Sequence, residues 1–97
     1  MPAMDRMEGL SVFVAAAEAG SFAEAGQRLH LSRSAVGKHI ARLEDRLGVK
    51  LFHRTTRRLS LTAEGEAFHA RCLRVISELD AAEAELQQGR SEPQGQL

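Results

Sequence analysis

Residues 21–48 have the sequence SFAEAGQRLHLSRSAVGKHIARLEDRLG, which contains two closely spaced signals for the start of a helix. Ser21 and Ser32 are N-cap residues, and Glu24, three positions after Ser21, completes a capping box. Gly48 is suited to the left-handed conformation that ends a helix. The stretch therefore predicts two short helices joined by about three residues, which is the spacing of a helix-turn-helix.

Apolar side chains in this region recur at helical spacing. A preceding helix is predicted from Asp5, which forms a capping box with Glu8, to about Ala19, before a stop at Gly20. The residues expected to face inward are Leu10, Phe13, Val14 and Ala17 in this first helix, Phe22, Ala25, Gly26 and Leu29 in the second, and Val36, Ile40, Leu43 and Leu47 in the third. A chain rich in Leu and Ala, with only four aromatic residues, is thus expected to be mainly α-helical.

The pattern changes after Gly48. Between Val49 and Leu61, short apolar segments flank the polar run HRTTRR, which predicts a small β-hairpin with a basic tip at residues 55–58. Thr62 then caps a last helix, predicted from about Ala63 to Gln88. The tail GRSEPQGQL has no apolar pattern and is predicted to be a flexible linker.

The last predicted helix carries an apolar seam that is longer than a small domain needs for its own core. Its positions alternate at spacings of four and three, the repeat of a two-helix coiled contact: Phe68, Cys72, Val75, Leu79, Ala82 and Leu86. Phe68 and Cys72 also suit packing on the domain itself, and the alternative is that the whole stripe packs there. The later positions favour a second copy of the chain as their partner.

Charge is segregated along a chain whose formal net charge is zero. Residues 21–62 hold nine Lys or Arg against three acids, a formal charge of +6, and the rest of the chain carries −6. A basic module joined to an acidic support favours a polyanion as the partner. The alternative is a solvated charged face without a ligand.

Several classes of function are disfavoured by the composition. The four histidines, at positions 30, 39, 53 and 69, have no dense metal-ligand spacing, and Cys72 is the only cysteine. Since the chain also lacks a glycine-rich phosphate loop, we expect no metal site, no cofactor and no enzyme activity. No apolar run is long enough to span a bilayer and the N-terminus has no signal-peptide pattern, so a cytoplasmic protein is expected.

Five ordered elements of the sequence resemble the N-terminal DNA-binding domain of LysR-type bacterial transcription regulators. They are Ala25 with Gly26, Ser32 with Arg33, Leu43-Glu44 followed by Leu47-Gly48, Leu51-Phe52 with Arg54, and Thr62 with Gly65. The resemblance implies a winged helix-turn-helix over residues 1–62, in which three helices carry a β-hairpin wing, and a dimerising linker helix over residues 63–88 whose two copies pair antiparallel. Residues 89–97 would be a flexible tail.

The resemblance also implies the partners. The expected ligand is double-stranded DNA, bound by a homodimer on an imperfect inverted repeat. Family members of full length continue into an effector-binding domain, so a small-molecule effector is expected to act only through that part, which this sequence lacks.

The candidate DNA contacts follow from the helix-turn-helix, whose second helix presents its N-terminal half to the major groove. They are Ser32, Arg33, Ser34, Gly37, Lys38, His39 and Arg42 in that helix, and Arg54, Thr55, Thr56, Arg57 and Arg58 on the wing. Ser32 also caps a helix N-terminus that suits a phosphate. For His39 the alternative is a solvated side chain, and for Arg58 it is an ion pair with the last helix.

Two of these positions depart from the family pattern. Arg33 stands where the family commonly has Gln, and it suits either a bidentate contact to guanine or a phosphate clamp. Gly37 stands where the family usually has Ser, and it either permits close approach to DNA or merely lacks a hydroxyl contact. The rival to DNA binding is a purely structural helix bundle, which would leave the basic helix and wing unexplained.

Overall fold

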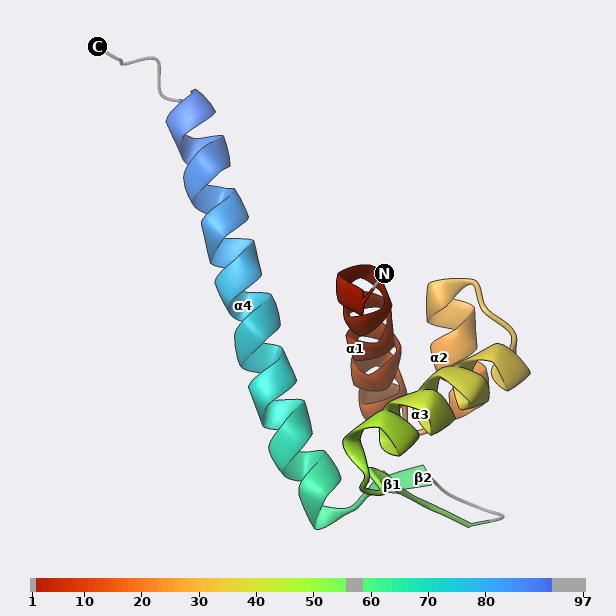
Figure 1. The fold of residues 1–97 in the computed structure, drawn as a ribbon. Coiled ribbons are helices and arrows are strands. Elements are labelled where there is room, and N and C mark those ends of the chain that lie inside the picture. Colours follow the sequence, from red (N-terminus) through yellow and green to blue (C-terminus); the bar gives the residue numbers. More distant parts are fainter. Residues whose placement is uncertain (1, 56–58, 92–97) are drawn as a thin grey trace.

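The computed structural model describes residues 2–55 and 59–91. In chain order the elements are α1 (Pro2–Ala19), α2 (Phe22–Leu29), α3 (Arg33–Leu47), β1 (Phe52–Arg54), β2 (Leu59–Leu61) and α4 (Ala63–Ser91). Helices α1 to α3 form a compact group, the hairpin lies beside α3, and α4 projects away from them (Figure 1). The molecule measures 59 × 26 × 25 Å, and its long axis reflects the projecting helix. The mainly helical prediction with one small hairpin is confirmed.

Helix α1 begins earlier than predicted. It starts at Pro2, so Asp5 lies inside the helix, and the predicted capping box of Asp5 with Glu8 is wrong. A proline is well tolerated at the first helical position because its missing N–H would have no intrahelical partner there. The other end agrees with the prediction: Gly20 has a φ of 70°, and its N–H donates to the carbonyl of Ala16 at 2.9 Å.

The core forms around α1, which packs against α2, α3 and α4. Phe13 and Val14 are buried, with Leu10 and Ala17 packed at the edge, as the predicted stripe requires. Because three helices surround α1, its Val12, Ala15 and Ala16 are buried as well. The predicted inward stripe of α3 ends early: Val36, Ile40 and Leu43 are buried, but Leu47 is exposed in the last turn, where the chain leaves the helix at Gly48.

Four phenylalanines connect the elements through ring contacts. Phe13 of α1 lies 5.5 Å from Phe52 of β1 and 5.1 Å from Phe68 of α4, measured between ring centroids. Phe22 of α2 lies 6.1 Å from Phe52, edge to face. Such distances are favourable for aromatic pairs. The hairpin and the base of α4 are therefore anchored on the same core as the helix-turn-helix.

The turn between α2 and α3 depends on a close approach of backbone to Gly26. The N–H of Leu31 donates to the Gly26 carbonyl at 2.8 Å, and His30 adopts a φ of 59° at the end of α2. A Cβ on Gly26 would collide with the carbonyl oxygen of Leu31. Ser32 then caps α3, accepting from the N–H of Ala35 at 3.0 Å, as predicted. These contacts fix the angle at which α3 leaves the turn.

The hairpin and α4 follow the predicted order. The two strands pair antiparallel with Phe52 opposite Leu61 and Arg54 opposite Leu59. Thr62 caps α4 by accepting from the N–H of Gly65 at 2.9 Å. Helix α4 continues to Ser91, beyond the predicted end at Gln88, so the predicted tail is helical over its first three residues, and residues 92–97 lie outside the described part.

We expect Gly26→Ala to destabilise the chain by about 1–3 kcal/mol, because the added methyl group forces the Leu31 backbone to move. Gly9→Ala in α1 is the matched control: nothing lies within 4 Å of a Cβ there, so removal of a helical glycine should stabilise by about 0.5–1 kcal/mol. Urea unfolding of both variants measures the two free energies. Equal changes in the free energy of unfolding for both variants would show that the α2–α3 turn has room for a side chain at residue 26.

Candidate nucleic-acid interface

Helix α3 presents one polar face to solvent. Ser34, Lys38 and Arg42 follow one another at intervals of four residues, and all three are exposed. They lie opposite the buried side of the helix, which carries Val36 and Ile40. Helical geometry therefore places a hydroxyl and two cations in a row along the outer surface. Ser32 and Arg33, at the N-terminus of the same helix, are also exposed, whereas His39 is half-buried.

Gly37 belongs to the flank of α3 that faces α2. A Cβ built on it would lie 3.7 Å from two carbons of the Phe22 ring, which is ordinary van der Waals contact. A side chain at this position would thus begin on the Phe22 side of the helix. The glycine lies beside the outward row of Ser34, Lys38 and Arg42, not within it.

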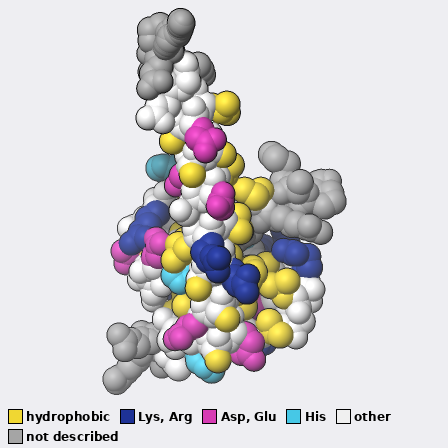
Figure 2. Space-filling view, turned by 90° about the vertical axis from the view of Figure 1, so that its left-hand side faces the viewer, with side chains coloured by type: hydrophobic (Ala, Val, Ile, Leu, Met, Phe, Trp, Pro, Cys, Tyr) yellow, Lys and Arg dark blue, Asp and Glu magenta, His cyan; other side chains and the backbone are white. Residues whose placement is uncertain are grey.

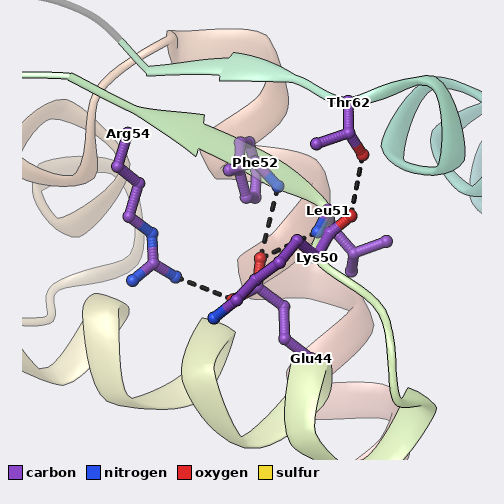
Figure 3. Close-up of polar contacts among 6 residues, drawn as sticks. All are labelled: Glu44, Lys50, Leu51, Phe52, Arg54 and Thr62. Atoms are coloured by element: carbon purple, nitrogen blue, oxygen red, sulfur yellow. Dashed lines mark hydrogen bonds and ion pairs between the residues drawn. The ribbon is translucent and has the colours of Figure 1, made fainter.

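The carboxylate of Glu44 joins α3 to the start of the hairpin (Figure 3). Glu44 is only 3% exposed. Its Oε2 accepts from the backbone N–H of Leu51 at 2.8 Å and from that of Phe52 at 3.2 Å. Burial of a charge is costly unless hydrogen bonds and an opposite charge compensate for it, and here both are present.

Two cations of the hairpin segment approach the other oxygen of this carboxylate. Arg54 donates from Nη2 to Glu44 Oε1 at 3.0 Å, and Lys50 Nζ lies 3.8 Å from the same oxygen. The guanidinium of Arg54 also stands over the Phe22 ring, with its Cζ 5.4 Å from the ring centroid. Arg54 is therefore held between α2 and α3, while its side chain remains 42% exposed.

A second set of polar contacts fixes the start of α4 to the same segment. The hydroxyl of Thr62 donates to the carbonyl of Lys50 at 2.8 Å (Figure 3). The Thr62 N–H donates to the carbonyl of Leu51 at 3.0 Å. A Cβ on Gly65 would collide with the Leu51 carbonyl oxygen, so this residue lets α4 pass close to the strand. Residues 50–52 are thus tied to α3 by Glu44 and to α4 by Thr62.

The predicted wing contacts are only partly within the described chain. Thr55 follows β1 and is exposed. Thr56, Arg57 and Arg58 lie outside the described residues, and their DNA contacts stay predictions. Arg28, by contrast, is ion-paired: it lies 3.4 Å from Glu24, four residues earlier in α2, and 3.8 Å from Glu18 of α1.

The predicted seam of α4 divides into two parts. Phe68 is half-buried and Cys72 is buried on the core, where burial raises the pKa of the Cys72 thiol and keeps it neutral. Farther along the helix Val75, Leu79 and Leu86 are 49%, 45% and 69% exposed, and Ala82 is exposed too. Figure 2 shows the face of α4 that is turned away from α1, where hydrophobic side chains lie among acidic and basic ones along the projecting helix.

Sequence reasoning named Glu44 in the Leu43-Glu44 element and counted it among the acids of the basic segment, but it assigned no contact or role to this side chain. A signal was present: Glu44 follows Ile40 by four residues and Val36 by eight, so it lies close to the buried stripe of its helix. An acid at such a position requires a buried partner, and the arginine and free backbone N–H groups of the next segment supply one.

The family follows from the comparison with known proteins. Residues 7–66 match the model of the bacterial regulatory helix-turn-helix proteins of the lysR family. The chain belongs to this family. Among curated relatives, the HTH-type transcriptional regulator CrgA of Neisseria meningitidis serogroup C (strain 8013) is 47% identical over 90 residues, which cover 93% of this chain and 30% of that protein. The chain thus spans less than a third of that LysR-family relative.

Two solved structures of LysR-family DNA-binding domains have the same fold. The CbnR domain, crystallised in a complex with DNA, has a TM-score of 0.74 and 35% sequence identity, with 88% of this chain and 97% of that chain covered. The BenM domain, crystallised with DNA of benA site 1, has a TM-score of 0.81 and 28% identity, with 89% and 97% covered. The winged helix-turn-helix prediction is confirmed.

Over residues 2–55 and 59–91 no group of His, Cys, Asp and Glu side chains has a metal-binding arrangement. No helix in that part of the chain is both long and apolar enough to cross a membrane.

Gly37→Ala is expected to raise the melting temperature by about 2–8 °C, because alanine gains about 0.5–1 kcal/mol over glycine in a helix and Phe22 leaves room for the methyl group. Ala41→Gly, on the exposed side of α3, is the matched control and should lower it by a similar amount. Thermal unfolding followed by circular dichroism measures both. A decrease for Gly37→Ala would mean that α2 and α3 pack too closely to accept a side chain.

Proposed function

We propose that the chain is a sequence-specific, double-stranded DNA-binding module of a bacterial transcription regulator, that it acts as a homodimer in the cytoplasm, and that it catalyses no reaction. The observation that carries this proposal is the exposed row of Ser34, Lys38 and Arg42 on a helix whose position is fixed by a capped turn and by the buried Glu44. The proposed domains are residues 1–62 for DNA binding, 63–88 for dimerisation and 89–97 for the tail.

Helix α3 enters the major groove in this proposal. Ser34, Lys38 and Arg42 follow the groove along the outer face of the helix, and Arg33 reaches a guanine edge from the first turn. Ser32 keeps the N-terminus of α3 in place, where free backbone N–H groups suit a phosphate. Gly37 and His39 lie beside the row of Ser34, Lys38 and Arg42. His39 makes a further contact to a phosphate or a base.

The hairpin contacts the DNA backbone and the minor groove. Arg54 is suited to a phosphate because Glu44 and Phe22 restrict its guanidinium while much of the side chain stays exposed. Thr55, Thr56, Arg57 and Arg58 extend this contact along the wing, where arginines benefit from the negative potential of a narrow groove. An arginine that is already oriented loses less conformational freedom when it binds.

Dimerisation uses the exposed part of the α4 seam, and the two copies pair antiparallel, as the resemblance to the family implies. In the heptad set by the seam, Arg71, Glu78 and Glu85 occupy one flank and Glu83 the other. In a parallel pair Glu78 would face the partner's Glu83, so like charges would meet. In an antiparallel pair each flank faces its own copy, so Arg71 of one copy lies on the same side as Glu78 and Glu85 of the other and offsets part of their repulsion. Two modules related by such a twofold axis require an imperfect inverted repeat in the DNA.

The homodimer is tested by Leu79→Asp, which places a charge in the middle of the exposed seam. We expect this variant to sediment as a monomer in analytical ultracentrifugation, because a carboxylate in the apolar contact would lose its hydration without a compensating partner. Ala84→Asp adds the same charge to α4 at a position off the seam and should remain dimeric. Equal behaviour of both variants would contradict the proposed interface.

Base recognition is tested by Arg33→Ala. We expect a loss of roughly 1–3 kcal/mol on the specific duplex and relaxed preference at one base position, with little change on random DNA. Competition binding against a library of single-position variants of the operator measures both effects. Equal losses on specific and random duplexes would assign Arg33 to a phosphate.

The function as a whole is tested by fluorescence anisotropy with two duplexes, the intergenic DNA upstream of the protein's own gene and a scrambled sequence, over a series of salt concentrations. A preference of roughly 10³ for the upstream DNA supports a specific regulator module. Equal, weak and steeply salt-dependent binding to both duplexes would contradict specific recognition of this DNA, because counterion release alone produces that behaviour.

A further inference from the structure

Glu44 differs from the described cations of the proposed interface, Arg33, Lys38, Arg42 and Arg54, because it is buried. It lies 3% exposed on α3, apart from the outward row of Ser34, Lys38 and Arg42. An acid near a DNA-binding surface opposes binding through its charge alone, since it repels phosphate. Its contacts give it a different effect.

The two oxygens of Glu44 have separate tasks. Oε2 accepts from the N–H groups of Leu51 and Phe52, and so it anchors the start of β1 on α3. Oε1 faces Arg54 Nη2 at 3.0 Å, with Lys50 Nζ at 3.8 Å. One oxygen therefore fixes the backbone of the wing, and the other orients a cation that the wing carries (Figure 3).

We propose that Glu44 is a positioning residue for DNA recognition: without touching DNA, it holds the hairpin and the guanidinium of Arg54 at a fixed place relative to α3. This inference rests on the proposed function and adds a residue to it. The Phe22 ring confines Arg54 from the side of α2, so the cation is restrained by two helices at once. Helix and wing then meet the duplex as one surface.

The sign of the effect separates this role from simple electrostatics. If Glu44 acted only as a negative charge, its neutralisation would strengthen binding to any duplex. If it positions the wing, neutralisation weakens binding to the specific duplex, while binding to random DNA stays equal or increases. The ratio of the two affinities therefore falls only under the positioning role.

Glu44→Gln is the appropriate variant because it keeps the size of the side chain. Its amide oxygen can still accept from Leu51 and Phe52, whereas its NH₂ group faces the donors of Arg54 and cannot pair with them. We expect affinity for the upstream duplex to fall about fivefold or more, and the preference over scrambled DNA to fall with it. Anisotropy measures both affinities.

Asp45→Asn is the matched control. Asp45 is the next residue of α3 and is exposed, so this variant removes the same formal charge without removing a contact to the hairpin. It should strengthen binding to both duplexes by a similar factor. If Glu44→Gln behaves like Asp45→Asn, with equal gains on both duplexes, the positioning role is overturned.

A double-mutant cycle with Arg54→Gln tests whether Glu44 acts through Arg54. In the Arg54→Gln background, Glu44→Gln should cause no further loss of specific affinity, because the cation that it orients is gone. An undiminished loss in that background would overturn the proposed action through Arg54.

A failure of the proposed function can be distinguished from a failure of the positioning role of Glu44. A wild-type chain that binds both duplexes equally contradicts specific recognition itself. The contact between Glu44 and Arg54 is then tested without DNA, by measuring the urea unfolding of Glu44→Gln, Arg54→Gln and the double variant. We expect the two substitutions to be coupled by about threefold or more in the unfolding equilibrium constant. Additive effects would overturn the inference independently of any DNA.

Discussion

The buried carboxylate of Glu44 holds α3 and the hairpin together, and the arrangement of the proposed interface depends on it. Its two oxygens satisfy the backbone N–H groups of Leu51 and Phe52 and bind the guanidinium of Arg54. A hairpin with three residues in each strand has little stability alone, so it requires an external support. Glu44 supplies the polar part of that support and the ring of Phe52 on Phe13 supplies the apolar part.

The placement of the acidic residues explains how a chain with no formal net charge presents a basic surface. The acids of residues 21–62 are few, and one of them is buried against cations of the wing. The remaining acids belong mainly to α1 and α4, away from the outward row of α3. A long α4 carries acidic charge and the exposed seam away from the helix-turn-helix, so the proposed dimer contact and the proposed DNA contact occupy different parts of the molecule (Figure 1).

Much of this fold could be predicted from local signals. Ser32 and Gly48 could be predicted as the ends of α3 because helix capping depends only on neighbouring residues in the sequence. The seam of α4 could be predicted because its spacing lies within one helix. The start of α1 at Pro2 was missed because several residues compete as a first turn. Glu44 was missed because its role requires Leu51, Phe52 and Arg54, which reach it only after the chain has turned. The side toward which Gly37 faces depends in the same way on the placement of Phe22.

Amide hydrogen exchange at Leu51 and Phe52 tests most directly whether helix and wing form one unit. Both N–H groups donate to Glu44, so opening either of them deprives a buried carboxylate of one of its donors. We predict that both amides exchange as slowly as the core amide of Ile40, because they open only with the core. Exchange at the rate of an exposed peptide would show that the wing detaches from α3 in solution, and would contradict a preformed interface.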